Sequence, residues 1–114
     1  MARLTLRLDF APGQAIGHGK IRLLEAVRDH GSISAAGRTM GMSYRRAWLL
    51  VDDLNRCFRE PLVAAQVGGV KGGGASLTPF GRGVVAHYRA IEQAAATAGA
   101  DHVGALAASL AKSD

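Results

Sequence analysis

The sequence contains a single cysteine, Cys57, among its 114 residues. One thiol cannot form an internal disulfide, and the chain has no CxxC pair of the kind that binds zinc. Both absences favour a protein of a reducing compartment that folds without a structural metal. We therefore expect a cytoplasmic protein.

Long apolar runs are also missing. No stretch approaches the ~20 consecutive apolar residues that a membrane-spanning helix needs. Residues 3–10 alternate polar and apolar side chains, whereas a secretory signal peptide would have a continuous apolar core. The sequence thus predicts neither export nor a membrane partner.

The sequence contains no recognisable cluster of catalytic or metal-binding residues. Asp52 and Asp53 are neighbours on a predicted helix, so their carboxylates point in different directions and suit pairing with Arg56 better than shared acid–base chemistry. The glycine-rich segment lacks the Gly-x4-Gly-Lys-Ser/Thr order of a phosphate-binding loop. We expect no enzyme activity, no cofactor and no metal site. The histidines are scattered without ligand spacing, at His18, His30, His87 and His102.

Positive charge is what the sequence does have. Fourteen Lys and Arg residues exceed nine Asp and Glu residues, for a net charge of +5. Most of the excess falls within residues 38–82. Such an excess favours a polyanionic partner, with nucleic acid ahead of anionic lipid, although a solvated basic surface would have the same composition.

The hydrophobic periodicity predicts a mainly α-helical domain over residues 1–98 with a small β-hairpin, followed by a tail or short helix at 99–114. Apolar residues recur at helical spacing in the longer segments, polar and apolar residues alternate over residues 3–10, and Ser, Thr, Gly and Pro residues mark the ends of the predicted elements. We expect helices at 20–30, 35–40, 44 to before Pro61, and 79–97. We expect strands at 3–10, 62–67 and 75–77, with a connection at 11–19 and a glycine-rich loop at 68–74.

Residues 31–58 have the spacing of a helix-turn-helix. Gly37 supplies the small residue that two closely crossing helices need, and Gly41 suits a turn with positive φ. The third predicted helix begins after Ser43, a good N-cap residue. Its apolar stripe is expected to be buried, and Trp48 is expected to pack in the core. The stripe consists of Ala47, Leu50, Val51, Leu54 and Phe58, with Cys57 expected as a buried thiol beside it.

The predicted element order is that of a winged helix-turn-helix, which binds DNA through the exposed start of its third helix. An arginine there can donate two hydrogen bonds to a guanine. A glycine-rich wing lets the backbone approach a phosphate, although a plain hairpin tip would have the same sequence. We therefore predict a double-stranded DNA interface made by Ser32, Ser34, Ser43, Tyr44, Arg45, Arg46, Lys71, Gly72 and Gly73.

The fourth predicted helix carries an apolar face long enough to serve both the core and a second subunit, so we expect a homodimer. The face consists of Val84, Val85, Tyr88, Ile91 and Ala95.

Three segments together resemble the N-terminal DNA-binding domain of ModE-type molybdate-responsive regulators: Gly31–Ser34, Gly41–Trp48, and the wing with Leu77–Gly81. A helix-turn-helix alone would also suit LysR-type regulators, from which we separate this sequence by its wing and opening strand. The resemblance implies a dimer that binds an inverted repeat and represses molybdate-uptake genes. It implies that Ser32 and Ser34 hold the DNA backbone. We expect no molybdate site in this sequence, because the molybdate-binding module of the family has no counterpart in it.

Two other functions fit the same fold. A winged helix can act as an adaptor between proteins, and a basic one can bind DNA without sequence preference as an architectural protein. Weak, salt-insensitive DNA binding would indicate the adaptor, and a lack of sequence preference would indicate the architectural protein.

Overall fold

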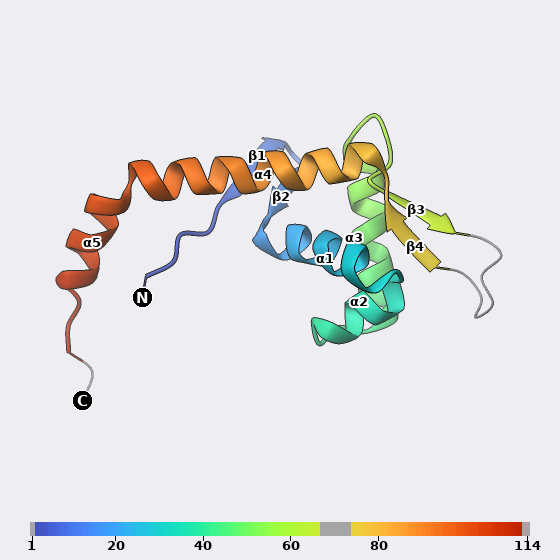
Figure 1. The fold of residues 1–114 in the computed structure, drawn as a ribbon, viewed down its shortest axis with the longest axis horizontal. Coiled ribbons are helices and arrows are strands. Elements are labelled where there is room, and N and C mark those ends of the chain that lie inside the picture. Colours follow the sequence, from blue (N-terminus) through green and yellow to red (C-terminus); the bar gives the residue numbers. More distant parts are fainter. Residues whose placement is uncertain (1, 67–73, 113–114) are drawn as a thin grey trace.

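The computed structural model describes residues 2–66 and 74–112. The described chain forms a mainly α-helical winged helix-turn-helix with a β-hairpin wing, as the sequence predicts, and a second antiparallel hairpin at its N-terminal end (Figure 1). The helices are α1 (His18–His30), α2 (Ile33–Thr39), α3 (Tyr44–Cys57), α4 (Pro79–Ala98) and α5 (Ala100–Ala108). The strands are β1 (Arg7–Ala11), β2 (Gln14–Gly17), β3 (Val63–Gln66) and β4 (Gly74–Leu77).

The N-terminal segment differs from the prediction of one strand and a long connection. β1 covers only the second half of residues 3–10, and β2 lies inside the segment predicted to be irregular. The two strands pair antiparallel, with Leu8 opposite Ile16, around a turn in which Gly13 has a φ of +76°. A four-residue strand between glycines has too few residues to show a period, so its sequence did not reveal it. α1 then begins two residues earlier than predicted.

The core is built around α1, whose Ile21, Leu23, Leu24 and Val27 are completely buried. Side chains from α3, both wing strands and α4 close around it. The predicted stripe of α3 is confirmed in part: Ala47, Val51 and Leu54 are buried, while Leu50 and Phe58 pack against the core from its edge. The apolar positions of the sequence therefore converge on one hydrophobic centre.

A polar network fixes α4 to the N-terminal half of the chain. The Arg89 guanidinium donates to both carboxylate oxygens of Glu25 on α1, at 2.7 and 3.1 Å, and to Glu92 at 2.7 Å. The bond from Arg89 holds the pKa of Glu25 below its usual value. The Tyr88 hydroxyl donates to the backbone oxygen of Leu6 at 2.6 Å. These bonds set the direction in which α4 leaves the core.

The helix-turn-helix junction matches its prediction at two glycines. A Cβ on Gly37 would lie 3.0 Å from the Cβ of Ala47, so α2 and α3 cross closely there and a larger residue would require Ala47 to move by a few tenths of an ångström. Gly41 has a φ of +68°, a conformation that other residues rarely adopt. The Met42 amide then donates to the Gly37 oxygen at 3.0 Å. The angle at which α3 is presented thus depends on these two positions.

A second corner joins the wing to α4. The Thr78 hydroxyl accepts from the Gly81 amide at 2.9 Å, which caps α4, and donates to the Pro61 oxygen at 2.7 Å. Gly81 faces the backbone of Leu62 so closely that an added Cβ would overlap the Leu62 carbonyl oxygen. The close contact locks the start of α4 against the segment that leads into β3.

The last two helices make the molecule long. α4 extends past the core and α5 turns away at its end (Figure 1). The radius of gyration is 16.9 Å, against about 13 Å for a compact domain of this size. None of the residues of α5 is buried, and Leu106 is 71% exposed. The tail predicted at 99–114 is therefore helical over Ala100–Ala108, while a domain boundary at residue 98 remains a prediction.

Candidate nucleic-acid interface

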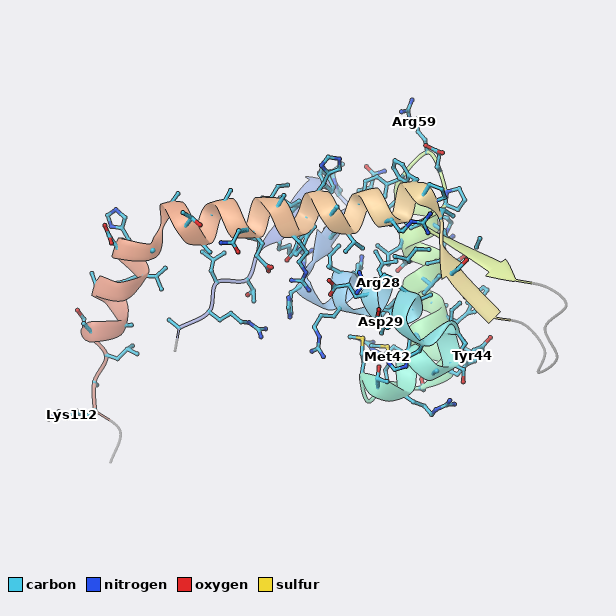
Figure 2. All side chains as sticks on the ribbon, in the orientation of Figure 1. Arg28, Asp29, Met42, Tyr44, Arg59 and Lys112 are labelled. Carbon is cyan, nitrogen blue, oxygen red and sulfur yellow. The ribbon has the colours of Figure 1, made fainter. Side chains whose placement is uncertain are left out.

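The start of α3 is exposed, as a DNA-binding helix requires. Ser43 caps the helix by accepting a bond from the Arg46 amide at 3.1 Å. Tyr44, Arg45 and Arg46 follow on the solvent side, and Tyr44 is 59% exposed. In Figure 2 the Tyr44 side chain projects from the helix-turn-helix on the side of the wing hairpin. The structure therefore brings these four predicted residues together on one exposed helix start.

The two predicted serines of the preceding helix lie beside them but differ in role. Ser32 caps α2, accepting a bond from the Ala35 amide at 3.0 Å. Ser34 lies inside α2, which begins two residues earlier than predicted, and its hydroxyl oxygen accepts from the Arg38 guanidinium at 3.0 Å. A serine hydroxyl that accepts one bond can still donate its own hydrogen. Both serines can thus donate to an anion while holding their helix.

Trp48 does not lie in the core, contrary to the prediction. Its side chain is 46% exposed. The buried line of α3 runs through Ala47, Val51 and Leu54, and the next residue along a helix is rotated by 100° from that line. Trp48 therefore lies beside the buried line and not on it. It follows Tyr44 by one helical turn, and both side chains lie on the side of α3 that faces the wing. Cys57 is likewise only half-buried, whereas a buried thiol was expected.

A groove of about 310 Å³ separates this side of α3 from the wing. The N-terminal part of α2 forms its third side. Aromatic rings line the α3 wall and small side chains line the wing wall. Its lining includes Ser32, Ser34, Tyr44, Trp48, Asp52, Ala65 and Gly74.

Asn55 holds the wing against α3, a role that sequence reasoning missed. Its side-chain oxygen accepts from the amides of Leu62 and Val63, at 2.8 and 3.1 Å. Its amide group donates to the Val63 oxygen at 3.1 Å. An asparagine between the buried positions of a helix looks like any other polar residue in the sequence, because its partners belong to a different element. The position of β3 depends on these three bonds.

Replacing Asn55 with alanine is expected to lower the free energy of unfolding by about 1–3 kcal/mol, since two backbone amides lose their acceptor. Asn55→Asp is the matched variant: at low pH its protonated carboxyl group can accept both bonds and donate to the Val63 oxygen, so its loss there should be smaller, whereas at neutral pH a carboxylate oxygen would face the Val63 oxygen without a donor. Urea unfolding measures the stability, and hydrogen exchange reports on the Leu62 and Val63 amides. Unchanged protection of both amides in Asn55→Ala would show that this side chain does not hold the wing.

The wing strands β3 and β4 each begin within a residue of the predicted start, while Val67, the predicted end of the first strand, lies outside the described residues. β3 and β4 pair antiparallel, with Val63 opposite Leu77, and the Ala75 amide donates to the Gly31 oxygen at 2.8 Å. The three residues predicted to contact DNA from the wing tip lie outside the described residues. They are Lys71, Gly72 and Gly73.

The charges around the interface are mostly positive. Arg38, Arg45 and Arg46 are exposed on α2 and α3. Asp52 and Asp53 pair with Arg56 at 2.9 and 3.3 Å, the pairing that the sequence favours. Across the ranges 2–66 and 74–112, no cluster of His, Cys, Asp and Glu residues could hold a metal ion. Nor is any helix in these ranges long and apolar enough to cross a membrane.

A helix-turn-helix with an exposed basic helix start, flanked by a two-stranded wing, defines a DNA-binding domain of regulatory type. Residues 18–82 match the family model described as "Bacterial regulatory helix-turn-helix protein, lysR family", and the chain belongs to this family. The family consists of DNA-binding transcription regulators. The matched range includes both wing strands, so the wing does not separate LysR-type from ModE-type sequences as we expected.

Individual relatives point to the ModE group. The chain is 45% identical over 92 residues to "Molybdenum transport protein ModE" of Azotobacter vinelandii, covering 81% of this chain and 33% of that protein. It is 43% identical over 94 residues to "Molybdenum-pterin-binding protein MopA" of Rhodobacter capsulatus, covering 82% and 35%. It is 35% identical over 74 residues to "DNA-binding transcriptional dual regulator ModE" of Escherichia coli K12, covering 65% and 28%. The chain spans about a third of the length of these relatives and corresponds to a ModE-type helix-turn-helix domain.

Proposed function

We propose that this chain binds double-stranded DNA in a sequence-specific manner and regulates transcription, in the cytoplasm, of genes connected with molybdate supply. The observation that carries the proposal is the exposed, basic start of α3, held at a fixed angle by Gly37 and Gly41. The link to molybdate rests on the names of the relatives alone. Repression, which the resemblance implies, belongs to the same proposal.

The chemistry of each side chain indicates whether it would contact a base edge or a backbone phosphate. Arg45 and Arg46 carry forked donors that match the edge of guanine, so we assign them to base recognition. Ser32, Ser34 and Arg38 lie to one side of α3 and suit backbone phosphates. Ser43 acts through its cap, because it fixes the first turn of the helix that presents the arginines. Lys71, Gly72 and Gly73 complete the proposal as a wing contact to phosphate.

A salt titration tests the DNA-binding claim. Fluorescence anisotropy of a labelled duplex should give an affinity that falls linearly on a log–log plot as salt rises, with a slope of about −0.9 for each phosphate contacted. Weak binding that ignores salt would instead indicate the protein adaptor. Adding molybdate to the same titrations tests whether the oxyanion acts on this chain.

We also propose that the DNA-binding form is a homodimer and that it assembles through α4. Val84, Val85 and Tyr88 of the predicted face belong to the core, but Ile91 is 44% exposed. It borders an apolar depression of about 460 Å³ between α4 and the β1–β2 hairpin, where Phe10 is 56% exposed. An exposed apolar surface of this kind, on a chain that a palindromic site would require in two copies, suits a second copy.

Introducing a charge into this depression should separate the subunits. Ile91→Asp is expected to shift sedimentation from dimer to monomer, because an aspartate would be buried without a partner. Ala86→Asp is the matched control, since Ala86 is exposed on the same helix and does not line the depression. A monomeric wild-type chain at high concentration, or equal effects of both variants, would contradict the assignment.

A further inference from the structure

The two aromatic residues of α3 form an exposed pair that the proposed contacts do not fully explain. Tyr44 and Trp48 lie one turn apart on the same wall of the groove, 59% and 46% exposed. Rings exposed in this way forgo the gain from burial, and Trp48 is the only tryptophan of the chain. A partner that covers the groove would bury both rings.

The opposite wall leaves room for that partner. The wing presents Ala65 and Gly74 to the groove, and these small residues keep β3 and β4 from filling it. Asn55 fixes the distance between the walls through its three bonds to Leu62 and Val63. The groove is therefore held open by the fold.

Hydrogen-bond donors stand along the same groove. Ser32 and Ser34 line its α2 side, and the Arg38 guanidinium is bound to the Ser34 hydroxyl at 3.0 Å. The Tyr44 hydroxyl and the indole N–H of Trp48 add donors from α3. Asp52 is the one carboxylate within the described lining, and Arg56 neutralises it at 2.9 Å. This set of donors, next to apolar ring faces, fits a chain that alternates anionic and apolar groups.

We infer that the groove between α3 and the wing holds the sugar–phosphate backbone of one DNA strand, with the Trp48 ring against a deoxyribose. The inference rests on the proposed function. It makes Trp48 a DNA contact and assigns Tyr44 to the DNA backbone. The phosphates on either side of that sugar accept bonds from the α2 serines, Arg38 and Tyr44.

The position of the groove favours backbone over base edges. The recognition helix of a helix-turn-helix enters the major groove, and here the wing stands across the groove from that helix, where the duplex would continue. The strand that separates these two parts passes between helix and wing, which is where Trp48 lies. Arg45 and Arg46 remain the residues that contact base edges. We therefore expect the side of α3 that bears Tyr44 and Trp48 to contribute affinity for any duplex, and Arg45 and Arg46 to contribute the sequence preference.

Trp48 supplies its own test, because its fluorescence is the only tryptophan signal of the protein. Titrating the chain with duplex DNA should shift or quench this fluorescence and protect it from acrylamide. Trp48→Ala should weaken cognate and random duplexes alike by about tenfold, since apolar contact to a sugar is lost whatever the sequence. Trp48→Phe should recover part of that loss. The half-exposed position allows all these variants to fold, which thermal unfolding verifies.

Two leucine substitutions on β3 test whether the groove must stay open for DNA to bind. Ala65→Leu places a larger side chain in the groove and should weaken all duplexes by more than tenfold. Ala64→Leu changes the adjacent residue of the same strand, which is exposed and does not line the groove, and should bind as the wild type does. A Trp48→Ala variant that lost only its preference for the cognate sequence would overturn the backbone assignment in favour of base contact.

The groove assignment and the proposed function can be tested separately. If the wild-type chain binds DNA in a salt-dependent manner while Trp48 fluorescence stays unchanged and Ala65→Leu binds normally, the groove assignment is wrong and the proposed function stands. If the wild-type chain binds no duplex, the proposed function is wrong, and the groove assignment is wrong with it.

Discussion

Replacing Gly81 with alanine is expected to lower the free energy of unfolding by about 3 kcal/mol, a large part of the roughly 5–15 kcal/mol that stabilises a typical domain. The added Cβ would lie 2.9 Å from the Leu62 carbonyl carbon and overlap its oxygen. That oxygen also accepts the Thr78 amide at 2.9 Å, so moving it away would break the corner that joins the wing to α4. The strain is therefore paired with lost hydrogen bonds.

Gly83→Ala is the matched control for this prediction. It lies on the same helix, and a Cβ there would meet nothing within 4 Å. Alanine in a helix interior is more favourable than glycine by about 1 kcal/mol, so this variant should be as stable as the wild type or slightly more so. Urea unfolding compares the two at a concentration too low for dimer formation, because Gly83 lines the depression proposed for the second copy. Equal stability of Gly81→Ala and Gly83→Ala would contradict the tight contact.

Arg45→Ala is expected to cost about 1–3 kcal/mol of affinity for the cognate site and to relax the base preference at one position. A methyl group cannot replace the two donors of the guanidinium, and the guanine edge would be left without its partner. Competition between the cognate duplex and single-base variants measures the effect. The affinity for random duplexes should change much less, through the loss of one charge.

Arg59→Ala removes the same charge away from the proposed interface. Arg59 is exposed and lies on the far side of the molecule from Tyr44 (Figure 2). This control should leave the base preference intact and weaken all duplexes only slightly, through long-range electrostatics. Sequence-blind losses of equal size in Arg45→Ala and Arg59→Ala would rule out base recognition by Arg45.

The helical half of this fold could be predicted because its signals are local. Ser43 and Thr78 are N-cap residues that indicate where α3 and α4 begin, and Gly41 indicates a turn. The apolar stripe of α3 recurs with the period of a helix. Each of these features depends on residues within a few positions of one another. The same holds for the exposed arginines of α3, since they follow directly from the cap and the stripe.

The features that were missed depend on distant partners. Trp48 was expected in the core because large rings are usually buried, but its position beside the stripe, facing the wing, exposes it. Asn55 and Gly81 both act on Leu62, which no local pattern connects with either of them. β2 became visible only through its pairing with β1. The candidate site could thus be predicted in its α3 part, while the groove and its supports could not.

The central claim is that this chain recognises a particular DNA sequence through α3. Selection of genomic fragments by the purified chain at near-physiological salt tests it most directly, because salt suppresses the non-specific background. We expect the chain to enrich an inverted repeat whose half-sites are about one helical turn apart. Recovery of fragments without a shared sequence would indicate an architectural protein, and recovery of no fragments would contradict DNA recognition and favour the adaptor.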